Sequence, residues 1–63
     1  MKIQILTVSG KIHEKTFKKS ESEQILQNYP ITLIKFLLEK GCIMCDDGYL
    51  IFTKNIESFK EIE

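Results

Sequence analysis

The stretch PITLIKFLLEKG, residues 30–41, predicts the main core helix of this protein. On a helical wheel its charged residues fall on one side, and its apolar residues cover the opposite arc. Pro30 suits the first position of a helix, where its missing N–H would have no partner, and Gly41 is a typical left-handed cap after the last turn. The apolar arc comprises Ile31, Leu33, Ile34, Leu37 and Leu38. We therefore expect this helix to supply much of the core.

A shorter helix is predicted before Pro30. Residues 20–23 read Ser-x-x-Glu, the capping box in which the serine and glutamate side chains accept hydrogen bonds from backbone amides at the helix start. A narrow apolar stripe of Ile25, Leu26 and Tyr29 follows. Because the proline ring removes a donor and clashes with the preceding turn, we expect two separate helices that meet at Pro30.

Two β-rich runs precede these helices and predict a hairpin. Residues 2–8 and 11–17 flank a small-residue turn that ends at Gly10, which tolerates a positive φ. The apolar residues change parity halfway along the first run. A β-bulge near Leu6 or Thr7 would explain the change, because one extra residue reverses the alternation. Without a bulge, both faces of the first strand would be partly buried, as in a central strand.

Residues 42–53 predict a second hairpin, closed by Asp47-Gly48. Both residue types tolerate the positive φ that a two-residue type I′ turn requires. The apolar inner face would then consist of Ile43, Cys45, Leu50 and Phe52, and the mixed outer face of Cys42, Met44, Tyr49 and Ile51. In residues 54–63, a spacing of three between Ile56, Phe59 and Ile62 predicts a short amphipathic helix or a loosely docked tail, with Asn55 as its cap.

These elements predict a single small α+β domain over residues 1–63. Its order would be ββααββ with a C-terminal helical tail, and both hairpins would form one single-layer antiparallel sheet packed against the helices. The expected core consists of Ile3, Ile5, Ile12, Ile25, Leu26, Ile34, Leu37, Leu38, Ile43, Cys45, Leu50 and Phe52.

The charge composition bears on the class of partner. The chain has nine lysines, no arginine, nine acidic residues and a formal net charge of zero. Proteins that bind nucleic acid through its phosphates carry a positive excess, and arginine makes the commonest specific base contact, so nucleic acid is disfavoured as a partner. No apolar run approaches the ~20 residues of a membrane span. We therefore expect no membrane contact and a cytoplasmic protein with reduced cysteines.

The absence of alanine and arginine, together with ten isoleucines, indicates an AT-rich microbial or viral genome. It has no bearing on the chemistry of the chain.

One group of residues matches a known motif, the C-x-x-C formed by Cys42 and Cys45. In a strand these two residues point to opposite faces, so we expect Cys45 in the core, Cys42 half-exposed and no local disulfide. Zinc shared by two chains and a redox pair are the alternatives. We expect His13 at the surface, and turn chemistry accounts for Asp46 and Asp47. No catalytic, metal or cofactor-binding residue is assigned.

The stretch from Met1 to Phe17, with Gly10-Lys11 at its turn and a helix after it, resembles the first hairpin of ubiquitin-type β-grasp domains. No functional residue carries over with this resemblance. The second hairpin, coming after two helices, is similar to the wing of a winged-helix domain.

The expected function is that of a non-enzymatic protein-binding regulator or inhibitor, encoded by a virus or mobile element. It would act through surplus apolar surface on a protein partner or, as a homodimer, on a second copy. The residues expected on this surface are Phe36, Tyr49, Ile51, Ile56, Phe59 and Ile62. The alternative is a winged-helix-like DNA-binding regulator that uses the second hairpin, Lys35 and the lysines of residues 11–19 on phosphates. A zinc-stabilised dimer through the two cysteines is a third hypothesis.

Overall fold

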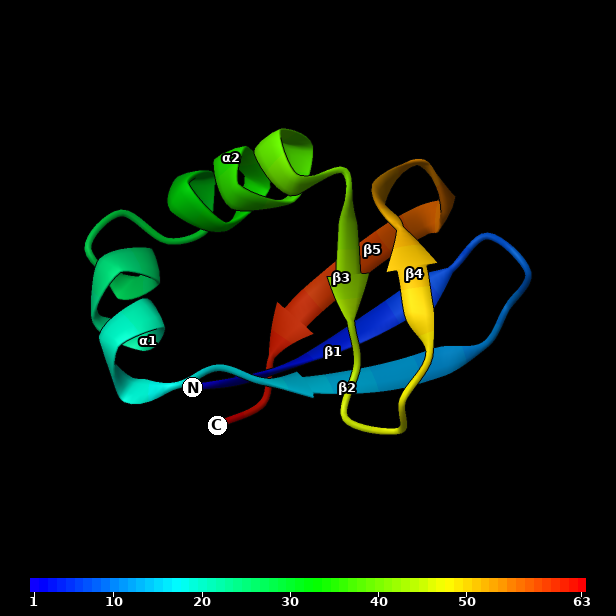
Figure 1. The fold of residues 1–63 in the computed structure, drawn as a ribbon, viewed down its shortest axis with the longest axis horizontal. Coiled ribbons are helices and arrows are strands. Elements are labelled where there is room, and N and C mark those ends of the chain that lie inside the picture. Colours follow the sequence, from blue (N-terminus) through cyan, green and yellow to red (C-terminus); the bar gives the residue numbers. More distant parts are fainter.

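The computed structural model describes residues 1–63 and confirms a small α+β fold with two helices and five strands (Figure 1). Along the chain the elements are β1 (Lys2–Thr7), β2 (Ile12–Thr16), α1 (Lys19–Leu26), α2 (Ile31–Lys40), β3 (Cys42–Met44), β4 (Leu50–Phe52), a 3₁₀ turn (Thr53–Asn55) and β5 (Ile56–Glu61).

The strands form two sheets. One is three-stranded and antiparallel, in the order β2-β1-β5, and the other is the hairpin β3-β4. The hairpin crosses the three-stranded sheet, and α2 lies beside β5 (Figure 1). The prediction that both hairpins share one sheet is therefore wrong: β5 is the third strand of the first sheet, and β3 and β4 pair only with each other.

The predicted C-terminal helical tail is also wrong, since these residues form β5. Leu6 pairs with Ser58 and Thr7 pairs with Ile56, so Glu57 is an extra residue on β5. Such a bulge reverses the alternation once, and it brings Ile56 and Phe59 to the same face of the sheet. A spacing of three, which is typical of a helix, is here produced by a bulged strand.

β1 is the central strand of the three-stranded sheet. For the change of parity in this strand, the sequence offered a bulge or a central position, and the central position is observed. The alternation of β1 is unbroken: Ile3, Ile5 and Thr7 are buried, while the residues between them are half-buried on the opposite face. The irregularity does fall between Leu6 and Thr7, but the extra residue belongs to the partner strand.

Both hairpins close with the same three-residue loop. In the second, the N–H of Cys45 donates to the carbonyl of Tyr49, and the N–H of Gly48 donates to the carbonyl of Cys45. Gly48 has a φ of +87°, and no residue other than glycine has a positive φ. This is a turn followed by a left-handed glycine, and the predicted two-residue type I′ loop is wrong.

The longer loop shifts the register of the second hairpin by one residue. Ile43 now pairs with Ile51, and Met44 pairs with Leu50. Because side chains alternate between faces, a shift of one residue moves Leu50 and Phe52 to the outer face and Ile51 to the inner face.

The helices begin and end close to the predicted positions. α1 starts at Lys19, and the Glu21 carboxylate accepts a hydrogen bond from the Lys18 N–H at 3.3 Å, so the predicted capping box at residues 20–23 lies within the helix. α2 starts directly after Pro30 and ends at Gly41, whose φ of +74° and N–H bond to the Leu37 carbonyl form the expected cap.

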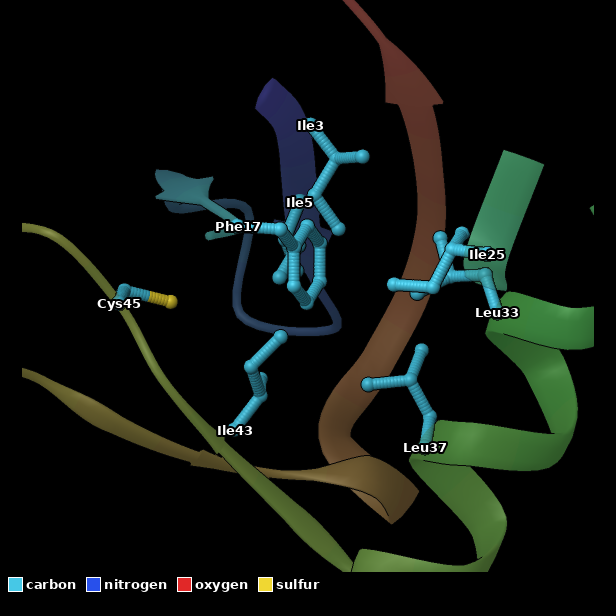
Figure 2. Close-up of a cluster of buried hydrophobic side chains, with 8 residues drawn as sticks. All are labelled: Ile3, Ile5, Phe17, Ile25, Leu33, Leu37, Ile43 and Cys45. Atoms are coloured by element: carbon cyan, nitrogen blue, oxygen red, sulfur yellow. The ribbon is translucent and has the colours of Figure 1, made fainter. Parts of the chain in front are cut away.

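The core lies between the sheet, α2 and the hairpin (Figure 2). Its members are Ile3, Ile5, Phe17, Ile25, Leu33, Leu37, Ile43 and Cys45. Phe17 and Leu33 were not expected there. Six predicted core residues are instead exposed: Ile12, Leu26, Ile34, Leu38, Leu50 and Phe52. Ile12 lies on the uncovered face of the sheet. Of its apolar arc, α2 buries only Leu33 and Leu37, which are four residues apart.

Leu33 and Leu38 provide a matched test of this packing. Leu33 is fully buried, whereas Leu38 is 69% exposed on the same helix. We expect Leu33→Ala to lower the free energy of unfolding by about 2–5 kcal/mol, because it leaves a cavity. Leu38→Ala should change it by no more than about 0.5 kcal/mol. Urea denaturation of both variants measures the difference, and equal losses would contradict the packing described.

Candidate functional site

The outer face of the second hairpin is an exposed apolar surface. The pairs Cys42–Phe52 and Met44–Leu50 place four apolar side chains on it, and we call these four residues the hairpin patch. Met44 and Phe52 are each 52% exposed and Leu50 is 47% exposed, while Cys42 is half-buried.

The inner face of the same hairpin is apolar as well. Ile43 and Cys45 are buried in the core, and Ile51 packs against it. An antiparallel hairpin with one face on a core and one face in water normally alternates apolar and polar residues. Here neither face is polar, so burial in the core does not account for the apolar residues of the hairpin patch.

A second apolar feature is a groove between α2 and β5, with a volume of about 340 Å³. We call it the α2–β5 groove. Its lining comprises Ile34, Leu37, Leu38, Thr53, Ile56, Glu57, Ser58 and Phe59. Leu38 and Ile34 are exposed along it, although the sequence predicted both for the core.

The tip of the second hairpin is held on β2 by Asp46. Its N–H donates to the Glu14 carbonyl at 2.8 Å, and its carboxylate accepts bonds from the N–H and the hydroxyl of Thr16 at 2.9 and 2.7 Å. These bonds from Thr16 lower the pKa of the Asp46 carboxyl, because they stabilise its charged form.

Asp47 makes a second contact between the tip and β2. Its carboxylate lies 2.7 Å from Nδ1 of His13, and because a carboxylate can only accept, Nδ1 carries the proton. The Tyr49 ring packs on the imidazole at 5.3 Å between centroids. The bonds from His13 and from the Tyr49 N–H lower the pKa of the Asp47 carboxyl.

These contacts correct two expectations. His13, expected at the surface, is only 7% exposed because the hairpin covers it. Asp46 and Asp47 do more than shape a turn, since their carboxylates join residues 30 or more positions apart in the chain. Nothing local in the sequence could indicate this, because the partners come from β2.

The cysteines lie as predicted, with Cys45 buried and Cys42 half-buried, and both are free thiols. Burial, with a further contribution from the Asp47 charge, raises the pKa of the Cys45 thiol. A thiol that resists ionisation is a poor nucleophile and a poor metal ligand. No group of three or more His, Cys, Asp or Glu residues is placed to hold a metal ion.

The structure separates the six residues expected on the partner surface. Four of them are half-buried and pack against the core: Phe36, Ile51, Ile56 and Phe59. Phe36 meets Phe17 edge to face at 5.9 Å, and Phe59 similarly meets Tyr29 at 6.4 Å. Tyr49 and Ile62 are exposed. Ile56 and Phe59 also line the α2–β5 groove.

The sequence placed Met44 on the outer face of the second hairpin, as observed, but Leu50 and Phe52 were missed as surface residues. The signal that could have found them is the run Cys45-Asp46-Asp47-Gly48-Tyr49, which also fits a three-residue loop ending in glycine. That loop length alone would have placed Leu50 and Phe52 on the outer face.

Neither helix has the length and apolarity needed to cross a membrane. Comparison of the chain with protein-family models, with curated proteins and with solved structures found no match. The function therefore has to be argued from the surfaces described above.

The contacts of Asp46 and Asp47 predict an acid-sensitive fold. A carboxyl with a depressed pKa stabilises the fold above its unfolded pKa and loses this contribution as the pH falls through its folded value. Because hydrogen bonds lower the pKa values of both carboxyls from the ordinary aspartate value, we expect the wild-type melting temperature to fall as the pH drops below about 4. The double variant Asp46→Asn/Asp47→Asn should melt lower at neutral pH and show a shallower fall.

Circular dichroism melts from about pH 7 to about pH 2 measure both profiles. Glu23→Gln, which changes an exposed carboxylate on α1 outside this cluster, is the control and should follow the wild type. Parallel pH profiles for the wild type and the double variant would contradict a role of these carboxylates in holding the hairpin.

Proposed function

We propose that this protein is a non-enzymatic regulator or inhibitor that binds another protein through the hairpin patch. The observation that carries the proposal is the half-exposed cluster of Met44, Leu50 and Phe52 on a hairpin whose other face already supplies the core. Contiguous exposed apolar side chains with an aromatic member are typical of the centre of a protein interface.

The surroundings of the patch support a protein partner. A hollow of about 480 Å³ lies beside it, between β4 and the turn that joins β1 to β2. Leu50 and Phe52 line it together with Lys11 and Tyr49. Protein interfaces commonly combine an apolar centre with such a polar rim, and their ~800 Å² per partner requires neighbouring surface of this kind.

A second copy of the chain is the nearest alternative partner. Two hairpin patches facing each other across a twofold axis would bury the same residues on both sides. The DNA-binding alternative receives no support from the position of the hairpin. Its tip lies on β2 instead of projecting, and it carries the carboxylates of Asp46 and Asp47, which repel phosphates.

The test compares two double variants that each remove two exposed apolar side chains. Leu50→Ser/Phe52→Ser changes the hairpin patch, and Leu26→Ser/Ile31→Ser changes residues of α1 and α2 that are 48% and 49% exposed. Immobilised wild-type protein and the control variant are both expected to retain the partner. The patch variant should retain it more weakly by about tenfold or more. Sedimentation equilibrium measures self-association in the same three proteins.

Self-association lost only in the patch variant would identify the partner as a second copy. Partners retained equally by both variants, or a wild-type monomer that retains nothing, would contradict the proposal. Circular dichroism of the variants verifies that the substitutions leave the fold intact.

A further inference from the structure

β5 is an edge strand whose outer backbone groups are open. Its pairing with β1 bonds alternate residues, and the N–H of Ile62 donates to the carbonyl of Lys2 at the end of the ladder. The same parity directs the backbone groups of Ser58 and Lys60 toward β1. The N–H and C=O groups of Phe59 and Glu61 therefore point to the open edge, where another strand could pair with them.

The α2–β5 groove lies beside this open edge. Leu37 forms part of its wall from α2 and points toward β5 in Figure 2, and Phe59 forms part of the wall from the strand. Residues that pair directly in an antiparallel ladder share a face. A strand added to β5 would thus place the side chain opposite Phe59 between the strand and α2, in an apolar groove of about 340 Å³.

Carboxylates flank this apolar position. Glu57, the bulge residue, lines the groove on one side of Phe59. Strand alternation places Glu61 on the same face two residues beyond Phe59, and both carboxylates belong to exposed residues. The edge therefore presents the order acidic, apolar, acidic, and an added strand complements it with the order basic, apolar, basic at alternate positions.

We propose that the open edge of β5 together with the α2–β5 groove binds an extended segment of another protein with the pattern basic-x-apolar-x-basic, by strand addition. The apolar side chain enters the groove opposite Phe59, and the two basic side chains pair with Glu57 and Glu61. The site is separate from the hairpin patch, so the two proposals succeed or fail independently.

The charges of the edge argue against a second copy as the occupant. If two β5 strands paired antiparallel with Phe59 opposite Phe59, each Glu57 would stand opposite a Glu61. If they paired with Lys60 opposite Lys60, two ammonium groups would face each other. Like charges directly opposite in a ladder are destabilising. Two copies of this edge would thus repel each other in these registers, whereas a basic strand is complementary to the edge.

The experiment titrates the full chain, labelled with ¹⁵N, with the synthetic peptides TKTLTKT and TETLTET. Strand addition by TKTLTKT should shift the amide signals of β5 and α2 and slow hydrogen exchange at Phe59 and Glu61, the amides that face the open edge. Exchange at Ser58 and Lys60 should change little, since these amides already bond to β1. TETLTET should bind at least about fivefold more weakly.

Two variants make the outcome specific. Glu57→Lys/Glu61→Lys should reverse the preference toward TETLTET, which a merely structural effect would not do. Leu38→Ser, which changes an exposed wall of the groove, should weaken both peptides, and the hairpin-patch variant should bind like the wild type.

Equal binding of the two peptides, shifts confined to the hairpin patch, or no binding of TKTLTKT at about 1 mM would overturn the proposal. Protection of the Phe59 and Glu61 amides that rises with protein concentration alone would also overturn it, because it would show that a second copy occupies the edge.

Discussion

The left-handed glycine at position 48 sets the constraint on which the rest of the structure depends. With Gly48 as the last residue of a three-residue loop, Cys45 pairs with Tyr49 and the register of the whole hairpin follows. This register turns Ile43 and Cys45 inward to complete the core. The same register turns Met44, Leu50 and Phe52 outward. The loop that Gly48 closes therefore decides both which residues complete the core and which apolar residues lie on the surface.

The small size of the chain explains why apolar residues remain outside. With a core of only eight buried apolar residues, α2 and the hairpin each bury one side and expose the other. Polar contacts add to this packing, since Asp46 and Asp47 tie the hairpin tip to Thr16 and His13 on β2. For the partner binding proposed above, a hairpin already held at its tip lowers the cost of ordering the surface.

Local signals in the sequence were sufficient for the elements that depend on local contacts. The break at Pro30, the cap at Gly41 and the two hairpins all follow from the chemistry of single residues. One failure is local, because the run around Gly48 fits both a two-residue and a three-residue loop. The other failures concern choices made by distant residues. The spacing of Ile56 and Phe59 fits a helix, and only pairing with β1 turns it into a bulged strand. The burial of His13 likewise depends on a hairpin from the other half of the chain.

The register of the second hairpin can be measured directly by nuclear Overhauser contacts between α-protons. In an antiparallel ladder these protons are closest in the pairs without hydrogen bonds, where the Cα atoms lie about 4.5 Å apart. A three-residue loop predicts strong contacts between Met44 and Leu50 and between Cys42 and Phe52. Contacts between Cys45 and Leu50 and between Ile43 and Phe52 would instead show a two-residue loop, would turn Leu50 and Phe52 inward, and would contradict the account.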